Sequence, residues 1–170
     1  IKWEKVLFCG NYCSNQLVKR IMTGLIGEFE ITLDSKGRFL LPAGFKKQLA
    51  EGDDVRFVIN RGIEKCLSIY PMSSWQPLAE KINALNDFNP KVREFKRLFL
   101  NGATFVEPDS AGRILVPGRL KEHAGIEKDA VMMGIGEKME IWDKSKYKEL
   151  FDSTTPEGLD DLAKEVMGGM

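Results

Sequence analysis

The chain has 170 residues, of which 43% are hydrophobic and 29% charged, so it can bury a core in one domain or in two small ones. Its 25 basic and 25 acidic residues cancel, which excludes a strong overall attraction to nucleic acid or to a membrane surface. No segment is apolar and long enough to span a bilayer, and we expect a soluble, cytoplasmic protein.

The N-terminal stretch, residues 1–21, gives no functional signal. It contains Cys9 and Cys13, but zinc needs about four ligands, and the third cysteine, Cys66, and the only histidine, His123, lie far away in the sequence. Reduced thiols in a cytoplasm are the better interpretation. We therefore predict no metal site.

The first clear pattern is an alternation of apolar residues at 29, 31 and 33 with polar residues at 28, 30 and 32, which predicts a half-buried strand. A turn follows at 34–37, because Asp and Ser can bond their own backbone and Gly37 can adopt a positive φ. Residues 38–41 predict a second strand ended by Pro42, and the two strands together predict a local hairpin.

The same pattern occurs twice. After a short helix at 43–50 and strands at 55–59 and 66–70, "DSKGRFLLP" (34–42) returns as "DSAGRILVP" (109–117), with six of nine positions identical. The second copy has strands around 104–106, at 113–116, at 130–135 and at 139–142, with a short segment ended by Gly125 and a turn at Gly136. We infer two tandem copies of one β-rich unit.

Amphipathic helices are predicted between and after the copies. Apolar residues share one face over 75–85 and over 91–99, with Pro90 suited to a first helical turn. A third stripe, at 159, 162, 163, 166 and 167, lies in residues 151–170, which hold five acidic residues and one basic residue. Such stripes usually serve core packing or subunit contact rather than cofactor binding.

The repeated turn has a structural and a functional interpretation. Asp34 can pair with Arg38, and Asp109 with Arg113, which would fix each turn. An arginine fork also suits phosphate oxygens or the O6 and N7 of guanine, and a β-ribbon is thin enough to enter a major groove. The two interpretations are compatible, although spacing alone favours the structural one.

Catalysis has little support in the sequence. Asp-Ser-x-Gly is similar to the Asp-Ser/Thr-Gly loop of aspartic proteases, but Lys36 or Ala111 separates Ser from Gly. The following arginine would also lower the pKa of a carboxyl that such a dyad must keep protonated. His123 is flanked by charge near a helix end, where a satisfied or exposed histidine is commoner than a catalytic one. We predict no enzyme activity, no cofactor and no small-molecule substrate.

"GEFEITLDSKGRFLLPAGFKKQL" (27–49) and "DSAGRILVPGRLKEHAGIEKDAVMMGIGEKMEIWDKSKY" (109–147) resemble the MraZ family, over about residues 22–150. These bacterial regulators of the division and cell wall genes carry two tandem SpoVT/AbrB-like units, each marked by Asp-x-x-x-Arg. The resemblance implies an α+β, β-rich fold in which two swapped-hairpin units form a small barrel with peripheral amphipathic helices. It also implies a ring-shaped homo-oligomer, nucleoid-associated, that binds repeated G-rich boxes in double-stranded promoter DNA upstream of its own operon.

Carried over by position, the motif residues are Asp34 and Arg38 in the first copy and Asp109 and Arg113 in the second. We expect Arg38, assisted by Lys36 of the same turn, to contact DNA, and Arg113 to be either a second DNA contact or a structural partner of Asp109. The turn-structuring residues would be Asp34, Gly37, Asp109 and Gly112. Because Ala111 replaces Lys36 in the second copy, we expect the first turn to make the stronger contact.

The same reading divides the chain into an N-terminal extension (1–21), a first unit (22–72), a helical connection (73–100), a second unit (101–143) and a helical, acidic tail (144–170). Two alternatives to a promoter-binding regulator remain. One is a non-catalytic oligomeric scaffold, and the other is an AbrB-like antitoxin, although antitoxins of that kind usually carry a single unit and a flexible tail.

Overall fold

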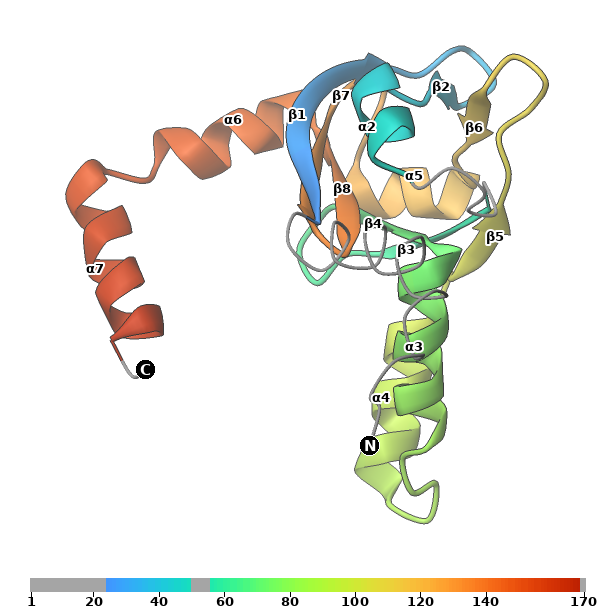
Figure 1. Ribbon diagram of the computed structural model, residues 1–170, viewed down its shortest axis with the longest axis vertical. Coiled ribbons are helices and arrows are strands. Elements are labelled where there is room, and N and C mark those ends of the chain that lie inside the picture. Colours follow the sequence, from blue (N-terminus) through green and yellow to red (C-terminus); the bar gives the residue numbers. More distant parts are fainter. Residues whose placement is uncertain (1–23, 50–55, 169–170) are drawn as a thin grey trace, which may run out of the picture.

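The computed structural model describes residues 24–49 and 56–168, and in this part of the chain the fold is mixed α and β with a strand-rich centre. A six-stranded antiparallel sheet runs in the order β1 (Leu25–Thr32), β7 (Asp129–Gly136), β8 (Lys138–Asp143), β4 (Leu67–Pro71), β3 (Phe57–Arg61) and β5 (Thr104–Val106). A separate two-stranded ribbon consists of β2 (Arg38–Leu40) and β6 (Arg113–Leu115) (Figure 1).

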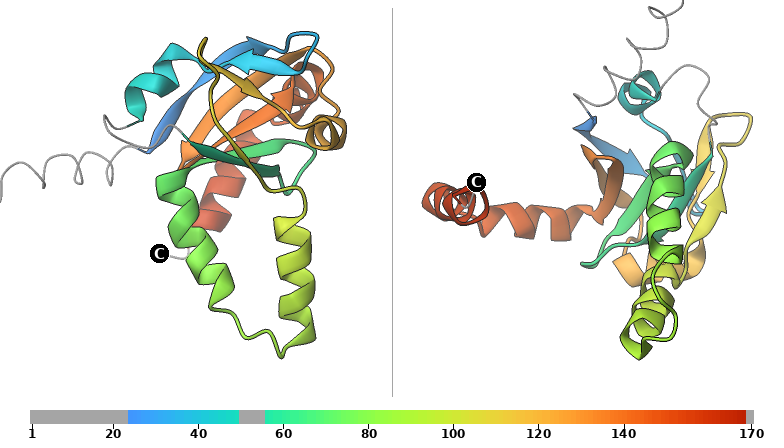
Figure 2. Two further views of the ribbon diagram at one scale, coloured as in Figure 1. Left: turned by 90° about the vertical axis from the view of Figure 1, so that its right-hand side faces the viewer. Right: turned by 60° about the horizontal axis from the view of Figure 1, so that its bottom comes forward.

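The described helices surround these strands. They are α2 (Ala43–Gln48), α3 (Met72–Asn83), α4 (Pro90–Leu100), α5 (Gly118–Ala124), α6 (Lys144–Asp152) and α7 (Pro156–Met167). Helices α3 and α4 project from one side of the sheet, while α6 and α7 leave it in a different direction (Figures 1 and 2). None of the helices in residues 24–49 and 56–168 is both long and apolar enough to span a membrane.

The predicted strands form, but the predicted local hairpins are wrong. Strand β1 pairs along its whole length with β7, from Leu25 opposite Gly136 to Thr32 opposite Asp129, and β2 pairs with β6. A strand of three residues such as β2 cannot satisfy the backbone of an eight-residue β1. The longer ladder satisfies more backbone groups, so β1 pairs with the distant strand.

The sheet is symmetric in the two copies. If each strand is replaced by its equivalent in the other copy, the strand order is the same when read from the opposite edge. β1 pairs with β7 of the other copy, β5 pairs with β3 of the other copy, and the equivalent strands β4 and β8 pair at the centre. Among the described strands, only β3–β4 and β7–β8 pair within one copy. The two copies are therefore interleaved in one sheet.

Equivalent residues of the two copies fill one shared core. Phe39 of β2 is 1% exposed and Ile114 of β6 is fully buried, and these two residues lie opposite each other in the ribbon. Phe45 of α2 and Leu120 of α5, each three residues after a proline, are buried in the same cluster. This core fixes where the two repeated turns lie.

Several helix boundaries agree with the sequence signals. α4 begins at Pro90 behind Asn89, whose side chain accepts a hydrogen bond from the N–H of Lys91. α5 ends at Gly125, which has a φ of 65° in the left-handed region, the conformation that favours glycine at a helix end. The strand expected at 55–59 is displaced toward the C-terminus, to Phe57–Arg61; residue 55 lies outside the described residues.

Candidate functional site

The first repeated turn is organised by Asp34. Its backbone N–H donates to the carbonyl of Arg38 at 2.8 Å, and its own carbonyl accepts from the N–H of Gly37 at 2.9 Å. Its Oδ1 accepts from the backbone N–H groups of Lys36 and Arg38, both at 2.9 Å. Its Oδ2 accepts from Nε and Nη2 of Arg38 at 2.8 and 2.7 Å. One carboxylate therefore closes the turn and orients the arginine.

The second turn repeats this geometry. Oδ1 of Asp109 accepts from the N–H groups of Ala111 and Arg113 at 2.9 and 3.0 Å, and Oδ2 accepts from Nε and Nη2 of Arg113 at 2.9 and 2.8 Å. Gly112, like Gly37, has a positive φ, of 74° against 77°. The pairing expected from the Asp-x-x-x-Arg spacing is thus present in both copies.

The structure brings the two turns together, which the sequence did not show. The N–H of Val116 donates to the carbonyl of Gly37 at 3.0 Å, and the N–H of Leu41 donates to the carbonyl of Gly112 at 3.3 Å. Nη1 of Arg38 lies 3.8 Å from Oδ2 of Asp109. Because β2 pairs with β6, residues 75 positions apart in the sequence form one continuous site.

The electrostatics of the site keep both carboxyls ionised. The hydrogen bond from the Arg38 side chain, helped by its backbone N–H, lowers the pKa of Asp34 to about 2. The backbone N–H of Arg113 is the main cause that lowers the pKa of Asp109 below its ordinary value. An acid–base pair that shares a proton is excluded here, because neither carboxyl holds a proton at neutral pH.

Each arginine is held along one edge by the carboxylate of its own turn, and Nη1 of Arg38 also approaches Asp109 of the other turn. The carboxylate occupies the edge formed by Nε and Nη2, while the Nη1 end points away from this pair. The side chain of Arg38 is 25% exposed and that of Arg113 is 39% exposed. Among the described residues, no hydrogen bond occupies Nη1 of Arg113, so this arginine can present its outer edge to a ligand.

A second lysine lies near the turns, and the sequence did not predict it. Lys36 is exposed on the first turn, as expected. Lys46 of α2 is also exposed, and its Nζ lies 2.7 Å from the place that a Cβ on Gly112 would take. The second turn, which has Ala111 in place of a lysine, thus receives a positive charge from the other copy. No local signal reveals this, because it depends on how the copies pair.

Other reactive groups form no catalytic arrangement in the described part of the chain. Burial raises the pKa of the Cys66 thiol to about 12, which keeps it protonated and unreactive. No group of three or more His, Cys, Asp or Glu residues in 24–49 and 56–168 could hold a metal ion. Cys9 and Cys13 lie outside the described residues.

His123 is half-buried, and its Nε2 has no hydrogen-bond partner among the described residues. It is therefore neither fully satisfied nor fully exposed, in contrast to the sequence-based expectation. Burial is the main cause that lowers its pKa, with Lys65 and Arg61 adding to the effect. The imidazole is consequently neutral at neutral pH.

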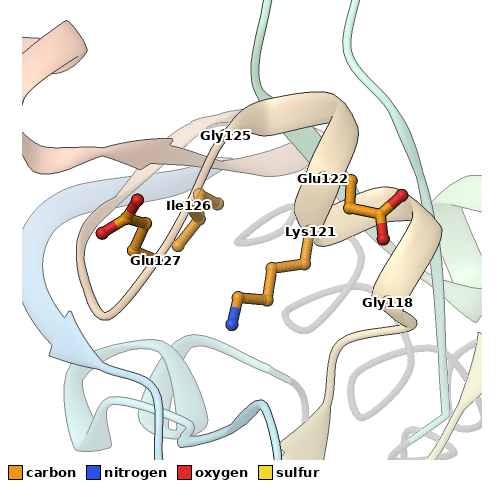
Figure 3. A pocket seen from close by; sticks show the side chains of 6 residues that line it. All are labelled: Gly118, Lys121, Glu122, Gly125, Ile126 and Glu127. Atoms are coloured by element: carbon orange, nitrogen blue, oxygen red, sulfur yellow. The ribbon is translucent and has the colours of Figure 1, made fainter.

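One surface hollow of about 450 Å³ lies beside α5. Its charged lining residues are Lys121, Glu122 and Glu127, and Figure 3 shows that these side chains point in different directions. A small-molecule site usually has polar groups that converge on the ligand. The repeated turns, rather than this hollow, are the candidate functional site.

The chain is similar to a known protein family over most of its length. The family model described as "MraZ protein, putative antitoxin-like" matches residues 25–98 and again 99–167. The chain belongs to the MraZ family. The two matches divide the chain into the same two copies that the repeated turn indicated.

Individual proteins that are similar to this chain carry the same family name. A protein named "Transcriptional regulator MraZ" from Christiangramia forsetii is 43% identical over 148 residues, which cover 86% of this chain and 95% of the relative. A protein of the same name from Caldanaerobacter subterraneus subsp. tengcongensis is 42% identical over 76% of this chain and 88% of its own. A solved structure, PHS018 from Pyrococcus horikoshii, is 19% identical over 70% of this chain and 89% of its own with a TM-score of 0.30, and this likeness carries no argument.

Proposed function

We propose that the protein is a sequence-specific, DNA-binding transcriptional regulator without catalytic activity. The observation that carries this proposal is the pairing of β2 with β6, which places two arginines held by carboxylates side by side on one surface. The relatives are named as transcriptional regulators, which supports the same conclusion.

In the proposed contact, Arg38 and Arg113 read base edges or phosphates. Asp34 and Asp109 fix the edge of each guanidinium that includes Nε. In Arg113 the outer edge formed by Nη1 and Nη2 would donate two parallel hydrogen bonds to O6 and N7 of guanine, and in Arg38 the same edge would have to exchange the approach of Nη1 to Asp109 for the base. A guanidinium already fixed in orientation loses less conformational entropy on binding. Lys36 and Lys46 would add contacts to the phosphate backbone.

The proposed target is a set of repeated G-rich boxes in the promoter ahead of the protein's own division and cell wall operon. A chain with 25 basic and 25 acidic residues gains little from general attraction to DNA, because backbone affinity grows with the number of phosphates neutralised. We propose that copies of the chain assemble into a ring. Once the first copy is bound, later contacts then form at an effective concentration on the order of millimolar.

The proposal includes the arrangement of the two copies. We infer that their interleaved strands are two swapped-hairpin units of the SpoVT/AbrB kind, which together form one small barrel. Residues 22–72 and 101–143 would supply the units, while 73–100 and 144–170 would supply helices for core packing and contacts between copies.

Arginine variants test the DNA contact directly. Arg38→Ala is expected to abolish the gel shift of the protein's own upstream DNA while the oligomer mass and melting temperature are retained. Lys148→Ala, an exposed substitution on α6, is the matched control and should bind as the wild type does. If Arg38→Ala instead prevents folding or assembly while Lys148→Ala does not, the arginine is structural and the proposed contact is wrong.

The relative importance of the turns needs a second comparison. Lys36 favours the first turn, but Lys46 and the greater exposure of Arg113 favour the second. We therefore propose that both turns contact DNA. Arg113→Ala should weaken binding at least about tenfold, as expected for the loss of one bidentate base contact. Unchanged affinity in Arg113→Ala would restrict the contact to the first turn.

The salt dependence separates phosphate contacts from base contacts. Lys36→Ala should weaken binding to all sequences similarly and reduce the slope of log K against log salt by about 1 for each bound turn. Arg38→Ala should also reduce the preference for the promoter over unrelated DNA. A wild-type protein that binds no DNA at any salt concentration would point to an oligomeric scaffold instead.

A further inference from the structure

Helix α7 carries an apolar stripe that nothing in the described chain covers. Leu159 is 60%, Leu162 55%, Val166 70% and Met167 62% exposed, and α7 contains no buried residue. These residues lie on one face because they recur at helical spacing. The helix stands apart from the sheet and from α3 and α4 (Figures 1 and 2), so the stripe has no partner among residues 24–49 and 56–168 of its own chain.

The equivalent helices of the first copy show which packing contact the stripe of α7 lacks. α3 and α4 follow β4 in the first copy as α6 and α7 follow β8 in the second. In the first copy, Trp75 of α3 stacks on Phe99 of α4 with ring centroids 6.2 Å apart, which holds the second helix against the first.

The equivalent of Trp75 makes a different contact. Tyr147 lies four residues after the end of β8, as Trp75 lies four residues after the end of β4. Its hydroxyl donates to Oε2 of Glu28 on β1 at 2.5 Å. Its ring packs against that of Phe151 in the same helix, with the ring centroids 4.7 Å apart. Tyr147 therefore ties α6 to the sheet and leaves α7 without the anchor that α4 has.

Helix α4 presents a matching surface. It contains no buried residue, although Phe95, Leu98 and Leu100 are apolar and remain 45%, 66% and 40% exposed. The contact of Phe99 with Trp75 leaves Leu98 on a different face of the helix. An apolar surface therefore remains on α4 after α3 has packed against it.

The charges of the two helices are opposite. α4 contains four basic residues and one acidic residue, and α7 contains four acidic residues and one basic residue. Lys91 and Arg97 of α4, and Glu157 and Glu165 of α7, form no ion pair among the described residues, so they are available to one another. Complementary charge of this kind orients a contact and disfavours the pairing of like helices.

We propose that α7 of one copy docks on α4 of a second copy of this chain. The two helices have 12 and 11 residues, so each is about 16–18 Å long and one can cover the other. The contact would bury the stripe of α7 against Phe95 and Leu98 and place its acidic residues beside Lys91 and Arg97. It is a head-to-tail contact, because two different surfaces meet, and such contacts form a ring where the rotation between successive copies closes.

The inference specifies the surfaces of the self-assembly proposed above and rests on it, but it does not depend on DNA binding. A charge exchange in the 170-residue chain tests it. Reversing α7 with Glu157→Lys and Glu165→Lys, or α4 with Lys91→Glu and Arg97→Glu, should raise the concentration needed for assembly at least about tenfold, as measured by analytical ultracentrifugation. Combining all four substitutions in one chain should restore assembly.

The matched control is a reversal of two exposed charges in the loop before β7, Glu127→Lys and Lys128→Glu, which should leave assembly unchanged. If the control disrupts assembly as strongly as the helix variants, or if the combined variant fails to recover while its melting temperature equals that of the wild type, the proposed contact is wrong.

Cysteine cross-linking identifies the partners. In a chain with Cys9→Ser and Cys13→Ser, one tagged version carries Leu162→Cys and another carries Leu98→Cys. After mixing and mild oxidation, we expect a disulfide between the two versions and much less between two copies of the same version. A cross-link between two Leu162→Cys chains would show that α7 pairs with itself and would overturn the proposal.

The outcomes separate this inference from the proposed function. A wild-type protein that assembles and shifts promoter DNA, but gives no cross-link between α7 and α4, contradicts only the docking contact. A wild-type protein that remains monomeric at all concentrations contradicts the proposed assembly and the docking contact together, while the DNA contact of Arg38 is still judged by the gel shift.

Discussion

Each aspartate of the repeated turn serves two purposes with its two oxygens. In Asp34, Oδ1 accepts from backbone amides and Oδ2 accepts from the guanidinium of Arg38. A turn that needed only closure could use asparagine, whose single oxygen accepts from the amides. The second charged oxygen is what fixes the arginine, so the carboxylate links the local fold to the proposed DNA contact.

The pH dependence of stability tests this role of Asp34. Its folded pKa is about 2, below the ordinary value of 3.8. The stabilisation from the ionised carboxyl is therefore present above about pH 4 and is lost as the pH falls through about 2. Asp34→Asn should unfold more easily than the wild type at pH 6, and the difference between the two should shrink between about pH 4 and pH 2.

Denaturant unfolding at a series of pH values measures this difference. Asp152→Asn, at an exposed site on α6, should show no comparable trend. A difference between Asp34→Asn and the wild type that stays constant down to pH 2 would mean that the carboxylate does not contribute through its charge.

At the scale of single residues, contacts within one turn could be predicted from the sequence, and contacts between the two turns could not. Asp34 and Arg38 are four residues apart around a glycine turn, so their pairing follows from spacing. The approach of Arg38 to Asp109, and of Lys46 to the position of Gly112, depends on which strands pair across the copies. No residue pattern within either turn contains that information.

At the scale of helices and strands, the ends of elements could be predicted from the sequence and the partners of strands could not. Pro90 and Gly125 mark helix ends through their own backbone geometry, and both signals were correct. The partner of a strand is set by competition among all strands with the same alternating pattern. Apolar residues at 29 and 31 are compatible with a neighbour on either side, and only the length of β7 allows β1 to be fully paired.

The ribbon of β2 and β6 should contribute strongly to stability despite its short length. Phe39 is 1% exposed and its neighbour Leu40 is 58% exposed, so successive residues of one strand face the core and the solvent. Phe39→Ala should lower the free energy of unfolding by about 3–5 kcal/mol through the lost burial and the cavity. Leu40→Ala should change it by less than about 0.5 kcal/mol.

Equilibrium denaturation of both variants measures these changes. Similar losses for the two substitutions would show that the faces of β2 are not divided between core and solvent. Because Phe39 lies opposite Ile114, Phe39→Ala should also disturb the position of the second turn, and a weakened gel shift beyond that of Leu40→Ala is expected.

At the scale of the whole molecule, the two copies depend on each other. Of the six strand pairs in the described chain, four join one copy to the other: β1–β7, β2–β6, β3–β5 and β4–β8. The repeat pattern alone predicts two consecutive units, since repeats are read along the chain, whereas the family resemblance implies swapped hairpins in one barrel. The pairing of β1 with β7 follows from their equal length of eight residues, which is evident only when both copies are considered together.

This interdependence leads to a prediction for fragments. Residues 24–100 retain only the β3–β4 pair, and residues 101–168 retain only β7–β8. A single two-stranded pair is marginal in water, and each fragment would also expose the face of β1, β2, β5 or β6 that the other fragment covers. As monomers at micromolar concentration, neither fragment should show cooperative unfolding, and their mixture should recover it.

Circular dichroism during denaturation, with the mass of each sample measured in parallel, distinguishes the possible results. The mass measurement matters because each fragment contains half of a symmetric arrangement and can pair with a second copy of itself. A 1:1 complex with a cooperative transition is the expected result for the mixture, with weaker stability than the intact chain because association must replace the covalent link. A monomeric 24–100 fragment that unfolds cooperatively would show that the first copy is an independent unit, and the side-by-side placement of the two arginines would then need another explanation.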